Sequence, residues 1–314
     1  MSLRAGAETI VDQCLNVKPG EYVLVVNDGN DQELIDSILE VLESTGCEYD
    51  LVEYPEPENH GTEPPQDVAE AMRDADVFIA PTKKSLSHTQ AREDACEAGT
   101  RGATLPGINK KIWNSSLQAD YSRVEEITEK VYSMLENTSE VRVKTPSGTE
   151  FTFEVDFDSF FTDTGIIHDS GMFGNLPAGE AHGGVRNGSG TIVIDHFPFA
   201  PSGTEVRVED SRIVDIEEES ASELGQALAE NECVRNIAEF GFGTNPEATL
   251  IGNTLQDEKV FGTVHIAFGD NTHYFSSGDR RTECGIHWDT VCENPTVWFD
   301  DQKVLDAGKP VFLD

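Results

Sequence analysis

The chain has 314 residues, of which 59 are acidic and 22 basic, and its net charge is -37. The acidic residues are spread over most of the chain and 37% of all residues are hydrophobic, which excludes a disordered acidic protein. The charge also excludes nucleic acid as a partner, because too few basic side chains are present to neutralise phosphates. An evenly acidic chain with only 10 lysines predicts a protein from a halophile, since high salt screens self-repulsion.

The sequence contains no segment typical of a membrane or secreted protein. No run approaches the roughly 20 apolar residues of a membrane helix, and Met1–Gly6 lacks the apolar core of a signal peptide. We therefore expect a cytoplasmic protein that does not bind membranes. The six cysteines lack CxxC spacing, which excludes a zinc ribbon and predicts buried, reduced thiols. They are Cys14, Cys47, Cys96, Cys233, Cys284 and Cys292.

The first 137 residues alternate between helical and strand patterns. Helices are expected at 5–15, 31–44, 64–73, 88–97 and 122–136, and strands at 22–27, 49–54, 76–81 and 100–105. Gly46 is expected to end the second helix. This alternation predicts a parallel sheet with helices on both faces. We assign residues 1–137 to an α/β domain.

After Asn137 the pattern changes to short strands and turns. A hairpin is expected around Pro146-Ser147-Gly148, followed by strands at 191–194, 205–208 and 212–216 and a helix at 221–231. The glycine-rich segment 183–190 lacks a GK[ST] ending and precedes a strand, so we interpret it as a loop lining a cleft rather than a phosphate loop. Residues 138–314 are assigned to an α+β domain with a mostly antiparallel sheet.

This second domain also carries the candidate metal ligands. Glu258, His265 and the segment His287-Trp288-Asp289 lie within 32 residues of one another. Imidazole and carboxylate together suit zinc, manganese, cobalt or ferrous iron, although ordinary core or surface histidines are the alternative. Upstream, Glu180 and Glu239 lie beside glycines and apolar residues, a setting that argues against free exposure.

Four motifs, NLPAGE, AEFGFGTNP, DEKVFGTVH and HWD, together resemble the thermophilic metallo-aminopeptidase family, the aminopeptidase T/S group (peptidase family M29). The match is specific over residues 170–290, whereas the N-terminal half resembles the family only in its α/β pattern. The resemblance implies a homodimer, for which the Phe-rich segment 158–173 is a candidate interface. It also implies two divalent ions (cobalt, zinc or manganese) and Glu258 as general base. The implied metal ligands are Glu180, Glu239, His265, His287 and Asp289.

The chain departs from the aminopeptidases in two places. After Glu180 it has Ala181-His182-Gly183-Gly184 instead of a Val-Phe-Thr-Ala-Pro-like run. A family tyrosine seven residues after the first histidine is Thr272 here, and Tyr274 is nearby but out of register. These departures leave the substrate and the second metal open.

A sister group, the 2,5-dihydroxypyridine 5,6-dioxygenases, is similar to this chain in fold and in its shorter length. It resembles the chain through His265, His287 and Asp289, which in that group hold one ferrous iron. In this interpretation Glu180 is an acid/base and His182 contacts the substrate. Independently of this alternative, Glu180 is also predicted to be catalytic, and His182 and Tyr274 are the predicted substrate-binding residues.

The two resemblances predict different chemistry. Hydrolysis of an N-terminal peptide bond needs an activated water, which two metals about 3.5–4 Å apart can supply. Glu258 would take the proton of that water and return it to the leaving amine. Glu239 and Glu258 favour this aminopeptidase, which we predict, whereas His182 favours the alternative, a mononuclear Fe(II) dioxygenase acting on a small molecule. A structural metal site is disfavoured, because such sites are usually rich in cysteine.

The remaining polar candidates are interpreted as structural. His168-Asp169 and Asp195-His196 are adjacent pairs. Because neighbours in a strand point to opposite faces, the two members of such a pair cannot hold one metal ion together. His273 is interpreted as a loop residue, because no carboxylate motif accompanies it. Arg186 is expected to pair with one of the many acidic residues.

Overall fold

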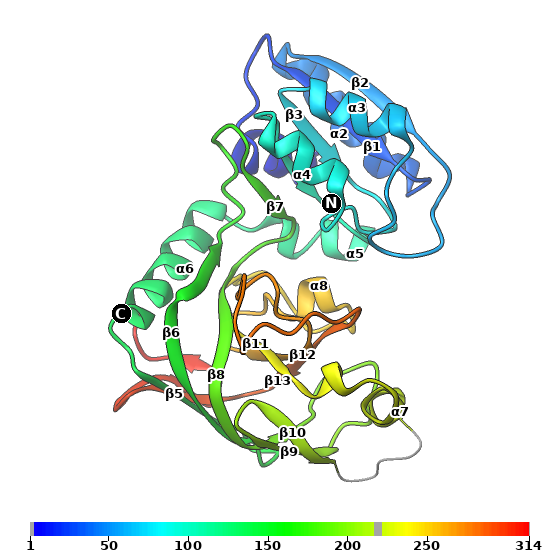
Figure 1. Cartoon of the computed structure of the whole chain (residues 1–314). Coiled ribbons are helices and arrows are strands. Elements are labelled where there is room, and N and C mark those ends of the chain that lie inside the picture. Colours follow the sequence, from blue (N-terminus) through cyan, green and yellow to red (C-terminus); the bar gives the residue numbers. More distant parts are fainter. Residues whose placement is uncertain (1–2, 217–221, 314) are drawn as a thin grey trace. The chain divides into compact units, whose positions relative to one another are not determined.

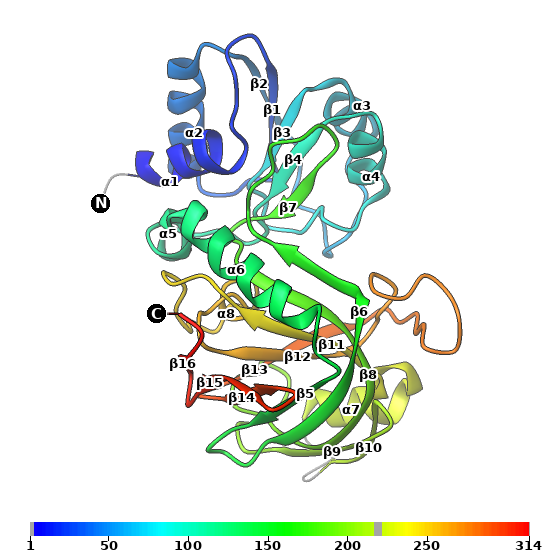
Figure 2. The same ribbon diagram turned by 90° about the vertical axis from the view of Figure 1, so that its left-hand side faces the viewer.

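The computed structural model describes residues 3–216 and 222–313 (Figures 1 and 2). They form two compact units, each assembled from separate segments of the chain. Unit 1 comprises Met1–Glu125, Asp163–Ala178 and Pro246–Thr249, and unit 2 comprises Glu126–Thr162, Gly179–Asn245 and Leu250–Asp314. The domain boundary expected at residue 137 lies inside unit 2. Among the described residues, no helix is both long enough and apolar enough to cross a membrane.

Unit 1 is built on a parallel sheet of five strands, in the order β2-β1-β3-β4-β7, which confirms the predicted α/β class. Helices α1 and α2 lie on one side of this sheet, and α3 and α4 lie on the other (Figure 2). The strands are β1 (Tyr22–Asn27), β2 (Glu48–Glu53), β3 (Val77–Ala80), β4 (Arg101–Thr104) and β7 (Phe173–Asn175). The helices are α1 (Arg4–Glu8, continued by a π-helical turn at Thr9–Cys14), α2 (Gln32–Thr45), α3 (Gln66–Asp74), α4 (Gln90–Glu97), α5 (Lys110–Trp113) and a 3-10 turn at Ser116–Gln118.

Local sequence explains most of these elements. All four residues of β3 are buried, as expected for an apolar strand with helices on both faces. Helix α2 begins after Asp31, whose side chain accepts a hydrogen bond from the backbone N–H of Glu33 at 3.0 Å. It ends at Gly46, which has φ 77°, a left-handed conformation that favours glycine. Strand β7 was not predicted, because it has only three residues and comes from a distant part of the chain.

Unit 2 is built on a mostly antiparallel sheet of eleven strands, which confirms the predicted α+β class. The main strand order is β13-β12-β11-β8-β6-β5-β14-β15-β16, and β9 pairs with β8 and β10. The strands are β5 (Glu140–Lys144), β6 (Glu150–Asp163), β8 (Glu180–Val193), β9 (Glu205–Glu209), β10 (Arg212–Ile216), β11 (Ile237–Gly243), β12 (Val264–Gly269), β13 (His287–Cys292), β14 (Thr296–Phe299), β15 (Gln302–Asp306) and β16 (Lys309–Pro310).

Within residues 3–216 and 222–313, four helical segments accompany this sheet. Helix α6 (Tyr121–Leu135) passes from the segment of unit 1 into unit 2. The others are α7 (Glu223–Glu230), a 3-10 turn at Glu232–Arg235 and α8 (Thr254–Asp257). Residue 221, the first of the helix predicted at 221–231, lies outside the described residues.

The glycine-rich segment 183–190 lies within strand β8, so the prediction of a loop there is wrong. Its glycines serve close packing. A side chain at Gly183 would collide with the ring of Phe160, and one at Gly184 would collide with the ring of Phe275. Because neighbouring residues of a strand point to opposite faces, the two glycines admit aromatic rings on both sides of β8.

One expectation about the cysteines is also wrong. Cys233 and Cys284 form a disulfide, with 5.7 Å between their Cα atoms and 51 residues between them in sequence. Such a spacing carries no information about pairing, because only the fold brings the two segments together. The other four cysteines are free thiols, and Cys14 and Cys292 among them are buried as predicted.

Candidate metal centre

Strands β13, β12, β11 and β8 are neighbours in the sheet of unit 2 and present polar side chains on one face. Residues two apart in a strand share a face, so His287 and Asp289 of β13 point the same way. The opposite face is apolar and includes the buried residues Ala181, Phe240, Phe242, Ile266 and Phe268. The polar face is formed by Glu180, His182, Glu239, His265, His287 and Asp289 together with small residues at Gly184, Gly241, Gly243, Ala267 and Gly269.

The small residues on this face make room for the larger ones. Gly241 of β11 is paired with His182 of β8 on one side and with His265 of β12 on the other. A Cβ atom at Gly241 would overlap the imidazole of His265 at both Cε1 and Nε2. The alternation of apolar residues with polar or small residues along these strands therefore decides both where the core lies and where the imidazole of His265 fits.

All of these polar side chains except His182, together with Glu258, form three overlapping groups, each with donor atoms within 4.8 Å of one another and able to hold a metal ion. We call the six residues of these groups the carboxylate–histidine cluster. The groups are Glu180, Glu239 and His265; Glu239, His287 and Asp289; and Glu258, His265 and Asp289. All five ligands implied by the family resemblance thus lie together, and so does Glu258. None of the three groups contains both His265 and His287.

Glu239 lies at the centre of the carboxylate–histidine cluster. Its Oε1 is 3.2 Å from Nε2 of His265 and 3.2 Å from Nδ1 of His182, and its Oε2 is 2.9 Å from Nε2 of His287. Burial raises the pKa of Glu239, but hydrogen bonds from the three histidines outweigh this and hold the pKa well below its usual range. Burial lowers the pKa of His265, but the carboxylates of Glu239 and Glu180 raise it to about 9. The cluster therefore favours positive charge, which protons or a metal ion can supply.

A buried lysine, which was not singled out in the sequence, completes the cluster. Lys259 is 2% exposed, its Nζ lies 2.8 Å from Oε1 of Glu258, and it also contacts Oε1 of Glu180. Burial raises the pKa of Glu258 to about 8, even though the charge of Lys259 lowers it. The available signal was weak: a lysine in DEKVFG, between acids and an apolar run, in a chain with only 10 lysines.

Aromatic side chains surround one side of the cluster. The hydroxyl of Tyr274 is 2.7 Å from Nδ1 of His182, so the tyrosine that is out of register in sequence is in contact with the site. The rings of His182 and His273 are parallel to within 5°, with centroids 6.2 Å apart. Phe161 of β6 lies next to both histidines, with centroids 6.4 Å from His182 and 5.4 Å from His273. We call these four residues the aromatic wall. His273 is a loop residue as predicted, but no sequence motif indicated its position beside the cluster.

The other polar candidates lie outside the cluster. Nε2 of His168 is 2.8 Å from the backbone oxygen of Gln13, and Nε2 of His196 is 3.0 Å from the carboxylate of Glu293. Arg186 is 3.8 Å from the carboxylate of Glu154, as expected for a pairing with an acidic residue. Neither histidine belongs to any of the three groups, which agrees with a structural interpretation.

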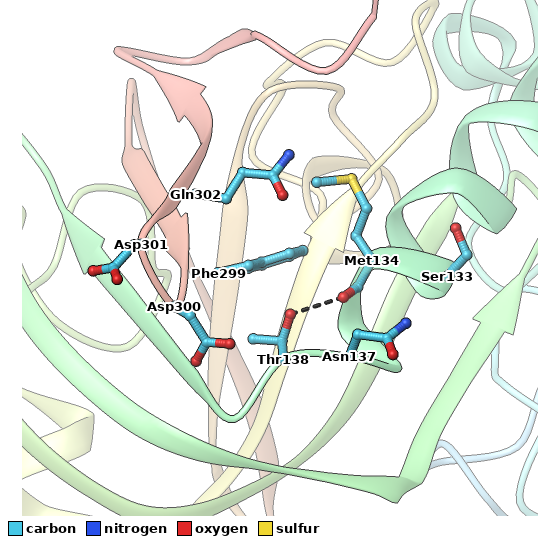
Figure 3. A pocket seen from close by; sticks show the side chains of 8 residues that line it. All are labelled: Ser133, Met134, Asn137, Thr138, Phe299, Asp300, Asp301 and Gln302. Carbon is cyan, nitrogen blue, oxygen red and sulfur yellow. Dashed lines mark hydrogen bonds between the residues drawn. The ribbon is translucent and has the colours of Figure 1, made fainter.

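Unit 2 also has a pocket where the C-terminal end of α6 meets the turn between β14 and β15 (Figure 3). It is lined by Ser133, Met134, Asn137, Thr138, Phe299, Asp300, Asp301 and Gln302. The hydroxyl of Thr138 donates a hydrogen bond of 2.7 Å to the backbone oxygen of Met134 within it. No residue of the carboxylate–histidine cluster lines this pocket, so it is separate from the candidate metal centre.

Two solved structures share the fold of this chain. The 2,5-dihydroxypyridine dioxygenase from Pseudomonas putida KT2440 has a TM-score of 0.79 at 19% identity, over 99% of this chain and 97% of that chain. AmpT from Thermus thermophilus has a TM-score of 0.70 at 17% identity, over 99% of both chains. At these identities the likeness shows the fold alone. No curated protein matched the chain in sequence.

A family model adds evidence from the sequence itself. The model called NicX, described as 2,5-dihydroxypyridine 5,6-dioxygenase, matches residues 7–312 and therefore nearly the whole chain. Both groups that the motifs resemble are thus represented among the comparisons, one by the family model and a fold neighbour and the other by a fold neighbour. The chain belongs to the NicX family of enzymes.

Proposed function

We propose that this chain is a mononuclear non-haem Fe(II) dioxygenase that opens the ring of a dihydroxylated pyridine or a similar planar aromatic compound. The sequence motifs favoured a dinuclear aminopeptidase. Two findings shift the proposal: the family model matches residues 7–312, and aromatic side chains line the candidate metal centre. The second finding carries the proposal, because it concerns this chain's own site.

The aromatic wall suits a flat aromatic substrate. Phe161 is a large apolar side chain that is 41% exposed, although it lies next to the buried cluster. Its ring is tilted against those of His182, His273 and Tyr274, with centroids 5.4 to 6.4 Å away. A planar ring can stack on such side chains, and each good aromatic contact contributes about 0.5–1.5 kcal/mol beyond area burial.

The residues present fit a divalent metal ion. Oε2 of Glu180 is buried and makes no hydrogen bond to any described residue, although it lies 3.3 Å from Nε2 of His265. His265, His287 and Asp289 would hold the iron, with Glu239 between the two histidines. Two imidazoles and one carboxylate are the ligand set typical of non-haem iron oxygenases. When bound, the iron supplies a redox-active centre at which the substrate and dioxygen can meet.

The protein side chains would bind and orient the substrate. The wall would hold the ring, and the hydroxyl of Tyr274, 2.7 Å from Nδ1 of His182, would orient that imidazole toward a substrate hydroxyl. Glu180 is placed to accept a proton from the substrate through Oε2. In the overall reaction one O2 is consumed for each ring opened, and both oxygen atoms enter the product, so no external reductant is required.

A dinuclear aminopeptidase is the second candidate, and one observation favours it. The two oxygens of Glu239 face different histidines, His265 at 3.2 Å and His287 at 2.9 Å, as a carboxylate bridging two metals would. The fold similarity to AmpT agrees with the resemblance to the aminopeptidase T/S group. In this candidate Glu258 would act as general base.

Metal content and oxygen consumption distinguish the two candidates. Protein purified in high salt and loaded anaerobically with Fe(II) is expected to retain one iron per chain. With 2,5-dihydroxypyridine it should consume one O2 per substrate molecule in an oxygen electrode, and removal of iron by a chelator should abolish this. Two cobalt, zinc or manganese ions per chain, with release of amine from an aminoacyl anilide and no oxygen uptake, would contradict the proposal.

Replacing Phe161 by alanine tests the aromatic wall. Loss of one aromatic contact of about 0.5–1.5 kcal/mol is expected to raise KM by roughly 2- to 12-fold. Iron content should stay unchanged, since Phe161 is not part of the carboxylate–histidine cluster. Met172, which is similarly exposed at 39%, provides a control as Met172→Ala. An unchanged KM in Phe161→Ala would remove this side chain from the substrate site.

A further inference from the structure

Lys259 is an unusual residue to find buried in a candidate metal site. Its side chain is 2% exposed and its Nζ contacts carboxylate oxygens of both Glu180 and Glu258. A buried ammonium is stable only when carboxylates compensate for its lost hydration. An ammonium group is a compact positive charge, so it can occupy a place between carboxylates that a metal ion would otherwise fill.

The position of Lys259 divides the carboxylate–histidine cluster into two sides. Glu180 and Glu258, which it contacts, each belong to a group that contains His265. The third group, Glu239, His287 and Asp289, contains neither of them. The ammonium therefore occupies carboxylate oxygens on the His265 side of the cluster and leaves those on the His287 side available.

We propose that Lys259 takes the place of a second cation and thereby limits this site to one metal ion. The proposal rests on the proposed mononuclear function. Two physical effects act together. The ammonium occupies one oxygen of Glu180 and one of Glu258, and its charge repels a divalent ion beside it, because like charges repel strongly where water is excluded. Without Lys259, the carboxylates of Glu180 and Glu258, with Glu239 as a bridge, would form a second metal position.

Lys259→Met is the main test, because methionine is also long and unbranched but carries no charge. The probe is Mn(II), which is bound by equilibrium dialysis in high salt and counted by elemental analysis. The wild-type chain is expected to bind one ion, and Lys259→Met is expected to bind two, a twofold increase. Electron paramagnetic resonance gives an independent readout, since two neighbouring Mn(II) ions produce a coupled spectrum that a single ion does not.

Three further variants control for charge, ligand and position. Lys259→Arg keeps the charge and is expected to bind one ion. The double variant Lys259→Met/Glu180→Gln removes a ligand of the new position and should return to one ion. Lys303→Met removes a lysine that is paired at 3.0 Å with Asp306, and neither residue belongs to the three groups, so this variant should not alter the metal count. Circular dichroism establishes that each variant is folded.

Each outcome decides the proposal. A folded Lys259→Met that binds one ion would overturn it, as would a wild-type chain that binds two. If the methionine variant does not fold, Lys259→Gln, which keeps a hydrogen-bond donor, replaces it with the same expectation. Failure of both to fold would assign the lysine a structural role and also overturn the proposal. A wild-type chain with one ion but no oxygen uptake would instead overturn the proposed function and leave the metal count intact.

Discussion

Replacing His287 by alanine is expected to lower metal affinity and oxygen uptake by more than about 100-fold, because loss of even an indirect partner of a metal ligand costs about 10–100-fold. Both ring nitrogens of His287 face hydrogen-bond acceptors: Nε2 lies 2.9 Å from the carboxylate of Glu239, and Nδ1 lies 2.7 Å from the backbone oxygen of Asp270. The side chain is 36% exposed, so its removal leaves no cavity in the core and the fold should persist. Elemental analysis and an oxygen electrode measure the two effects.

His196→Ala is the matched control for this experiment. His196 has a side chain that is 40% exposed and pairs with Glu293 at 3.0 Å, but it belongs to none of the three ligand groups. Its replacement should leave metal content and activity near those of the wild type. Full activity in His287→Ala would exclude this histidine from the site.

Gly241→Ala is expected to displace His265, one of the candidate metal ligands, and to destabilise the fold. The new Cβ would overlap the imidazole of His265, which is fully buried and cannot move aside freely. Forcing extra volume into a packed region costs about 1–3 kcal/mol of unfolding free energy. Since Nε2 of His265 is a candidate ligand atom, the displacement should also reduce metal content. Thermal unfolding and elemental analysis report the two effects separately.

Gly285→Ala provides the control for the glycine substitution. No atom lies within 4 Å of a Cβ built at Gly285, and this glycine is not among those with positive φ. Its replacement should therefore change neither melting temperature nor metal content measurably. Wild-type metal content in Gly241→Ala would show that His265 is not held where the structure places it.

Much of the fold could be predicted from local patterns. The apolar run at Tyr22–Asn27 is a buried strand, and the helix after Asp31 ends at Gly46, because capping and periodicity act over a few residues. The glycine-rich segment 183–190 was misinterpreted, because glycine in a strand signals close packing only when the packing partners are known. Strand β7 and the disulfide between Cys233 and Cys284 depend on distant segments and left no local signal.

The sequence by itself determined which candidate metal-binding side chains this protein carries. Its motifs contain the histidines and carboxylates, and their spacing of two residues in HWD already places His287 and Asp289 on one face of a strand. The tertiary structure decided how these groups combine. Strand order places β8 beside β11, and only that pairing brings Glu180 into contact with Lys259, 79 residues away. Long-range contacts of this kind follow from strand order and register, which local periodicity does not encode. The positions of Lys259, Phe161 and His273 at the site therefore emerged only from the fold.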